Sequence, residues 1–201
     1  MDEVRRGSVL AGSPKRFALV VVMSLSLAGA AGAEAATVNA SPTKWASTFC
    51  GSFVTWEQAA KTGDAKLTKV LNGLAKSGHA NLKNVRAQLV TFLSGFQTAT
   101  GRLQASMKAV GPPAVKNGGK IQMIIRGGIA KAQIAVAAAK KQAAVLPTNN
   151  APMFVRQTNA LAKSFTTTFN KLASSFSVLK RYSPPSLIAA AKASPACKKL
   201  G

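Results

Sequence analysis

Residues 82–110 read LKNVRAQLVTFLSGFQTATGRLQASMKAV, and this stretch decides the fold class. Its inward positions recur alternately three and four residues apart, which places them on one face of an α-helix. A helix of this length spans roughly 43 Å, and Gly111-Pro112-Pro113 predicts its end. The predicted inward face consists of Leu82, Val85, Leu89, Phe92, Phe96, Ala99, Leu103, Ser106 and Val110.

The segment before this helix predicts two shorter helices. Ser41-Pro42 is a capping serine followed by a first-turn proline, so a helix is expected over 42–61, ending at Thr62-Gly63. Asp64 is then expected to cap a second helix that stops at Ser77-Gly78. The first helix carries Trp45, Phe49, Phe53, Trp56 and Ala60 on one face, and the second carries Leu67, Val70, Leu71 and Leu74.

The segment after residue 110 predicts three more helices. One is expected over 114–146, although Gly118-Gly119 and Gly127-Gly128 weaken it and either allow close helix packing or mark a bend. Another follows residues 147–152 and stops at Ser183-Pro184-Pro185, and a short helix over 186–193 leads to Cys197. The inward residues are Ile121, Ile125, Ile129, Ala132, Val136, Ala139, Ala143 and Leu146 in the first, and Phe154, Leu161, Phe165, Phe169, Leu172, Phe176 and Leu179 in the second.

These helices predict an all-α fold. We expect an up-down-up-down four-helix bundle, with its first arm split into two helices and a short C-terminal helix tied back by a disulfide. The last long helix then ends beside the start of the first, which brings Cys197 to Cys50. Zinc binding by the two thiolates and His79 lacks a fourth ligand. Residues 36–201 are enough for one domain with a core of its own.

The first 35 residues have the pattern of a cleavable signal peptide. A basic start with Arg5, Arg6, Lys15 and Arg16 precedes the apolar run 17–27. Small residues with the A-x-A pattern follow at 31–33 and 33–35, so cleavage is expected after Ala33 or Ala35. An uncleaved anchor and twin-arginine export are the alternatives. The predicted location is secreted or extracytoplasmic, either free or associated with the cell wall.

The charge of the chain is strongly positive. Of 27 basic and five acidic residues, 23 basic residues and two acidic ones, Glu57 and Asp64, fall in 36–201, a formal charge of +21. No acidic residue follows Asp64, which removes carboxylates as catalytic groups or metal ligands from most of the chain. We therefore expect no enzymatic activity, no catalytic or metal site and no cofactor. Lysine outnumbers arginine, which favours diffuse attraction to an anionic surface over specific recognition.

Other candidate sites have a structural explanation beside the functional one. Trp45 and Trp56, with Phe49 and Phe53, could stack on bases or sugars, but their helical spacing favours the core. His79 follows Gly78 at a helix junction, where a solvated histidine is the simpler interpretation than a pH switch. The lysines could likewise be ordinary solvent-facing residues. The predicted diffuse polyanion-binding residues are Lys83, Arg86, Lys108, Lys131, Lys140, Lys141, Lys163, Lys171, Lys180, Arg181, Lys198 and Lys199.

The two cysteine-containing ends resemble those of a family of small exported helical proteins from actinobacteria. The opening Trp45-Ala46-Ser47-Thr48-Phe49-Cys50 has a Trp-Ala-x-x-x-Cys pattern, with Trp56 following. The ending 186–200 contains a Pro-x-Cys-x-x-Leu pattern from Pro195 to Leu200. The family has no assigned activity, so the resemblance implies export and a disulfide-tied helical domain but no catalytic residues. The near absence of acidic residues distinguishes this chain from more neutral relatives.

Two functions fit this sequence. The first is an exported, non-enzymatic basic protein that associates electrostatically with anionic cell-envelope polymers or an anionic lipid surface, and binds nucleic acid only incidentally. The alternative is an extracytoplasmic carrier that holds a small apolar ligand or a peptide within the bundle, where the glycine- and alanine-rich helix leaves room. A third interpretation, membrane disruption by basic amphipathic helices, fits poorly with a disulfide that closes the bundle.

Overall fold

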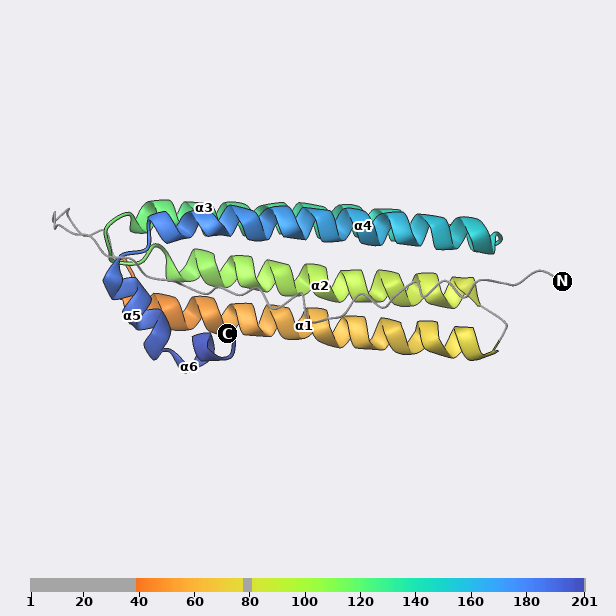
Figure 1. Ribbon diagram of the computed structural model, residues 1–201, viewed down its shortest axis with the longest axis horizontal. Coiled ribbons are helices and arrows are strands. Elements are labelled where there is room, and N and C mark those ends of the chain that lie inside the picture. Colours follow the sequence, from red (N-terminus) through yellow and green to blue (C-terminus); the bar gives the residue numbers. More distant parts are fainter. Residues whose placement is uncertain (1–38, 78–80, 201) are drawn as a thin grey trace.

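The computed structural model describes residues 39–77 and 81–200, and over these residues the protein is all-α. Figure 1 shows four long helices lying lengthwise beside one another, followed by short helices that return to the first. The predicted signal peptide, 1–35, and His79 lie outside the described residues. The elements are α1 (Pro42–Ser77), α2 (Leu82–Val110), α3 (Gly118–Ala144), α4 (Ala151–Phe176), the 3₁₀ helix η2 (Ser177–Arg181), α5 (Pro185–Ala193) and α6 (Pro195–Lys198).

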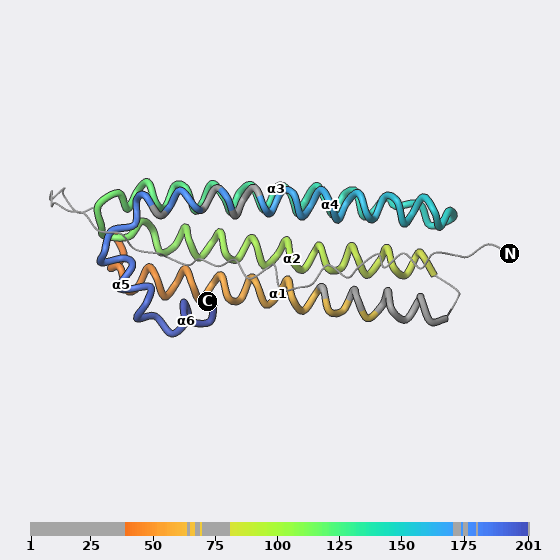
Figure 2. The backbone as a smooth tube through the Cα atoms, viewed as in Figure 1, coloured from red at the N-terminus to blue at the C-terminus, as the bar shows by residue number. Residues whose placement is uncertain are grey.

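The long helices pack in chain order. α2 lies between α1 and α3, and α4 packs on α3. α5 and α6 fold back onto α1, as the tube in Figure 2 shows. The short C-terminal helices therefore cover the N-terminal part of the first long helix.

Asparagine side chains begin two of the long helices. The side chain of Asn81 accepts a hydrogen bond from the backbone N–H of Asn84 at the start of α2. Asn150 does the same for Met153 at the start of α4, where Pro152 occupies the first turn. Each cap satisfies a backbone donor that has no partner within its helix.

The prediction that the first arm is split was wrong, because α1 is continuous from Pro42 to Ser77. Asp64 lies inside this helix and does not begin a new one. Gly63 lies opposite α2, where a Cβ atom would collide with the ring of Phe92. The glycine that looked like a helix stop therefore allows α2 to approach α1 closely.

The predicted start of the next helix at Ala114 was also wrong, because α3 begins at Gly118. Two backbone hydrogen bonds connect the segment between α2 and α3 to Ala40. The Ala40 N–H donates to the Pro112 carbonyl at 3.1 Å, and the Ala40 carbonyl accepts from the Ala114 N–H at 2.8 Å. Gly118 packs against the Pro113 carbonyl, where a Cβ atom would collide. These contacts hold residues 112–117 outside the helix.

The end of the chain also differs in detail from the prediction. The fourth long helix changes to a 3₁₀ helix at Ser177 before the predicted stop at Ser183. A last turn, α6, follows Ser194 and was not predicted. Within the described residues, no helix is long and apolar enough to span a membrane.

The core has two clusters of buried side chains. One lies toward the α3–α4 connection and includes Val85, Leu89, Leu93, Ala143 and Phe154. The other lies toward the disulfide end and includes Trp45, Leu103, Met107, Ile125 and Leu187. All eight predicted inward residues of the α3 segment are buried. The core therefore runs along the whole length of α3.

Cys50 and Cys197 form a disulfide, as predicted, with their Cα atoms 4.9 Å apart. The bond joins α1 to α6 across 147 residues of sequence. Ala46, one turn before Cys50, is buried beside it. The C-terminal helices are thus covalently attached to α1.

Candidate polyanion-binding surface

The predicted polyanion-binding residues are spread over the surface and do not form one patch. α2, α3 and α4 each carry some of them, and the others lie in η2 and at the C-terminal end. Their distribution fits diffuse attraction and not a single pocket for one anion. The side chains that are exposed are those of Lys83, Lys108, Lys131, Lys141, Lys163, Arg181, Lys198 and Lys199, while those of Lys171 and Lys180 lie outside the described residues.

Two of the predicted binding residues make contacts between helices. A guanidinium nitrogen of Arg86, on α2, donates a 3.2 Å hydrogen bond to the carbonyl of Leu146, just after α3. The ammonium of Lys140, on α3, lies 3.5 Å from Oε1 of Gln97 on α2. Because the C-terminal end of a helix carries partial negative charge, Arg86 also stabilises α3 electrostatically. These two residues hold α2 against α3 as well as adding charge.

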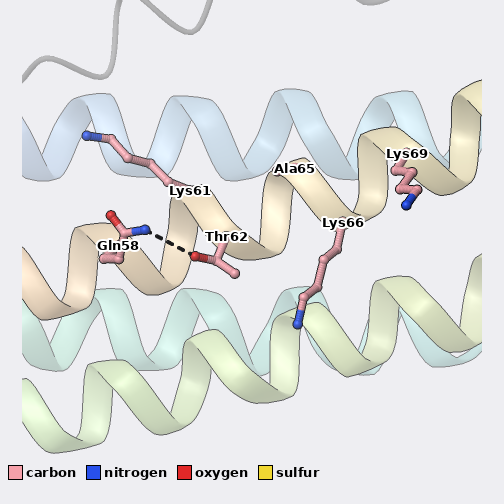
Figure 3. Close-up of a pocket in the computed structure, with 6 residues that line it drawn as sticks. All are labelled: Gln58, Lys61, Thr62, Ala65, Lys66 and Lys69. Carbon is pink, nitrogen blue, oxygen red and sulfur yellow. Dashed lines mark hydrogen bonds between the residues drawn. The ribbon is translucent and has the colours of Figure 1, made fainter.

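A shallow pocket of about 420 Å³ lies on the surface of α1 and contains lysines that the sequence prediction missed. Figure 3 shows its lining residues projecting from one stretch of the helix. Three cations and two neutral polar side chains offer N–H and O–H donors to an anion. The lining residues are Gln58, Lys61, Thr62, Ala65, Lys66 and Lys69.

Internal contacts occupy part of this pocket. The Lys61 ammonium pairs with the Glu57 carboxylate at 2.7 Å, one helical turn away. Nε2 of Gln58 donates a 3.3 Å hydrogen bond to Oγ1 of Thr62. Lys66 and Lys69 are exposed. The predicted helix break at residues 62–63 hid this cluster, because only a continuous helix places residues 58, 62, 65 and 69 on one face.

Trp45 is buried in the core and Trp56 packs against it partly buried, which supports the structural interpretation over the stacking platform. Trp45 is only 4% exposed, and its indole Nε1 donates to Oε1 of Gln122 at 3.1 Å. Nε1 of Trp56 donates to Oγ1 of Thr100 at 2.9 Å. Both ring N–H groups therefore have hydrogen-bond partners inside the protein.

The rings of α1 continue into an aromatic cluster that links three helices. Trp56 packs on Phe96 of α2 with ring centroids 5.0 Å apart, and on Phe169 of α4 at 6.0 Å. Phe165 and Phe169 lie 4.5 Å apart on α4. These separations are typical of stabilising aromatic pairs. The cluster joins α4 to α1 and α2.

Tyr182 contacts Lys120, a lysine that is not among the predicted polyanion-binding residues. The ammonium of Lys120 lies 4.2 Å from the centre of the Tyr182 ring. The pKa of the Tyr182 hydroxyl is lowered below its ordinary value, mainly by a hydrogen bond from Lys120 and secondly by the positive charge of Lys120. The pair attaches the segment after η2 to the start of α3.

Fold and surface together define a disulfide-tied, all-α protein with a distributed cationic surface. Comparison with protein-family models, curated proteins and solved structures finds no match to this chain.

Proposed function

We propose that this protein is an exported, non-enzymatic polycation that associates electrostatically with anionic cell-envelope polymers or surfaces. The observation that carries the proposal is the exposure of cations on each of the four long helices, exemplified by Lys66, Lys108, Lys131 and Lys163. With two acidic residues in 36–201, nearly all of these cations have no carboxylate with which to pair. A surface of this kind attracts polyanions from any direction.

The proposed fold is an up-down-up-down bundle formed by α1–α4 within a single domain, 36–201. Short connections support this topology, because neighbouring helices joined by a few residues run antiparallel. The packing of α1 on α2, α2 on α3 and α3 on α4 also supports it. The disulfide supports it further, since a fourth helix that returns to the start of α1 leaves only α5 and α6 to reach Cys50.

Export by a signal peptide over 1–35 is part of the proposal. Two cysteines joined in a disulfide fit an oxidising compartment outside the cytoplasm. Anionic wall polymers and lipid head groups are the polyanions accessible there. These polyanions are the partners that a strongly basic exported chain attracts. Nucleic acid, which is a polyanion as well, is then bound only incidentally.

The α1 pocket is a shallow surface site and not an enclosed cavity for an apolar ligand. Three lysine side chains line it, so cationic groups border a surface formed largely by aliphatic carbon. Apolar ligands prefer enclosed sites lined mainly by hydrophobic side chains. The carrier function therefore stays the second candidate.

A lysine scan tests the diffuse character of the binding. We compare Lys66→Gln/Lys69→Gln in the α1 pocket with Lys108→Gln/Lys163→Gln on α2 and α4, measuring binding to polyphosphate as a function of salt. Both double variants are expected to lower the slope of log affinity against log salt concentration by roughly one per lysine. If the pocket pair abolished binding and the other pair had no effect, the protein would have one specific anion site and diffuse association would be wrong.

A further inference from the structure

The outward side of α3 exposes large apolar side chains in a regular pattern. Met123 is 65% exposed, Ile134 is 71% exposed, and Val145, which directly follows the helix, is 77% exposed. Each is more exposed than the other large apolar side chains found at the surface of the described residues. The three positions stand eleven residues apart.

An eleven-residue spacing keeps side chains on one line of a helix. Eleven residues turn an α-helix through three full turns and about 20° more. The line from Met123 to Val145 is therefore about 33 Å long. Lys120 and Lys131 repeat with the same spacing, each three residues before an apolar member, and Lys141 precedes Val145 by four residues. Cationic and apolar side chains thus alternate along the α3 outer face, defined by these six residues.

The core does not explain this apolar line. The opposite side of α3 is filled by Ile121, Ile125, Ile129 and Val136, all of which are buried. A helix that packs on one side normally presents polar residues on the other. In contrast to α3, α2, whose residues are all described, has no exposed large apolar side chain. Met123, Ile134 and Val145 are therefore apolar members of the α3 outer face that are mostly exposed and do not belong to the core.

We propose that the α3 outer face docks on the surface of an anionic lipid bilayer. Met123, Ile134 and Val145 enter the boundary between head groups and acyl chains, and the flanking lysines meet the lipid phosphates. Helices bind in the plane of a membrane through this combination of an apolar line and basic flanks. The electrostatic part of this inference rests on the proposed function; the apolar part goes beyond it.

Charge complementarity favours a bilayer over other occupants. A second copy of this chain would bring Lys120, Lys131 and Lys141 against lysines of the same sign, which opposes association. A soluble anionic polymer would satisfy the lysines but leave the apolar side chains in water. An anionic bilayer offers phosphates and hydrocarbon together.

Matched double variants test the apolar contribution. Met123→Ser/Ile134→Ser removes two members of the α3 outer face, while Val155→Ser/Val178→Ser removes two exposed valines elsewhere. Binding is measured by co-sedimentation with vesicles of phosphatidylglycerol and phosphatidylcholine, and separately with soluble polyphosphate. We expect the α3 variant to bind vesicles at least about tenfold more weakly, because insertion of two large side chains is lost. The valine variant is expected to bind vesicles like the wild type, and both variants to keep their polyphosphate affinity.

Lysine variants test the electrostatic contribution of the same face. Lys131→Gln/Lys141→Gln should weaken binding to the anionic vesicles by about fivefold per lysine. The matched variant Lys83→Gln/Lys108→Gln, on α2, should weaken it much less. Both pairs are exposed, so folding should be unaffected. Equal losses in the two pairs would show that no particular face is turned toward the membrane and would overturn the inference.

Other outcomes separate the docking face from the proposed function. Wild-type vesicle affinity in Met123→Ser/Ile134→Ser, with polyphosphate binding intact, would overturn the docking face and leave the polycation function standing. If the wild type bound neither vesicles nor polyphosphate, both proposals would fail. A dimer in sedimentation velocity that this variant converts to a monomer would make the face a contact between two copies and overturn docking on lipid.

Discussion

The indole Nε1 of Trp45 donates a 3.1 Å hydrogen bond to Oε1 of Gln122 and thereby joins α1 to α3 inside the core. The amide of Gln122 in turn donates to the carbonyl of Met107 on α2. One buried side chain thus connects three of the four long helices. Buried polar side chains are generally hydrogen-bonded, and here both ends of the amide are used.

Replacing Gln122 by methionine should destabilise the protein. The substitution keeps the length of the side chain but leaves the Trp45 N–H buried without a partner, which costs about 1–3 kcal/mol. Urea unfolding followed by circular dichroism measures the change. Gln142→Met, at an exposed position of the same helix, is the control and should change stability little. Equal stability of the two variants would show that the Trp45 bond contributes nothing.

Breaking the disulfide should lower stability without unfolding the helices. Cys50 and Cys197 enclose a loop of 147 residues, and constraint of such a loop in the unfolded chain is worth about 5 kcal/mol in the entropic model. The variant Cys50→Ala/Cys197→Ala should keep the helical circular dichroism spectrum and unfold at much lower urea concentration. Identical unfolding curves for this variant and the oxidised wild type would contradict the expected stabilisation.

Gly63 should behave unlike an ordinary helical glycine. Replacing glycine by alanine inside a helix usually stabilises it by about 0.5–1 kcal/mol. Gly95→Ala should show this gain, because a Cβ atom there has open space around it. Gly63→Ala should instead destabilise the protein, because its Cβ meets the Phe92 ring. Thermal unfolding compares the two, and equal gains would mean that α1 and α2 do not meet closely at Gly63.

Lys120 should control the ionisation of Tyr182. The sequence contains one tyrosine, so the ultraviolet absorbance of tyrosinate reports on this group alone. Lys120→Gln should raise the pKa of Tyr182, because the hydrogen bond and the positive charge that lower it are removed.

The sign of the linked stability change follows from the lowered pKa. Because the pKa of Tyr182 is lowered in the folded protein, this interaction stabilises the fold fully above the ordinary tyrosine value near 10, and the contribution is lost as the pH falls through the lowered pKa. Lys116→Gln, an exposed position just before α3, is the control. An unchanged titration in Lys120→Gln would rule out the contact.

Regular features of the fold could be predicted from sequence because they depend on local pattern. The bounds of α2 agree with the prediction, since its three-and-four spacing ends at Gly111-Pro112-Pro113. Leu93, Thr100 and Met107 are also buried although the predicted stripe omitted them. They are buried because α2 lies between α1 and α3 and packs on more than one side.

The errors arose where contacts between distant segments override local signals. Gly63 resembles a helix end in sequence, but its role is to accommodate Phe92. The delayed start of α3 depends on Ala40, more than seventy residues away. The α1 lysine pocket was missed for the same reason, because it requires the helix to continue through Gly63. The exposed apolar line on α3 could not be recognised in the sequence, because the core residues on the other side of the same helix are apolar as well.

Electrostatic association with the cell envelope can be measured by a salt titration of the oxidised protein binding to isolated Gram-positive cell envelopes, before and after their anionic polymers are removed. We expect tight binding at low salt, a steep loss as the salt concentration rises, and weaker binding to the stripped envelopes, because each neutralised phosphate releases a counterion. Binding that is unchanged at about 0.5 M salt, where exposed charges are strongly screened, or that is absent at low salt, would contradict this association.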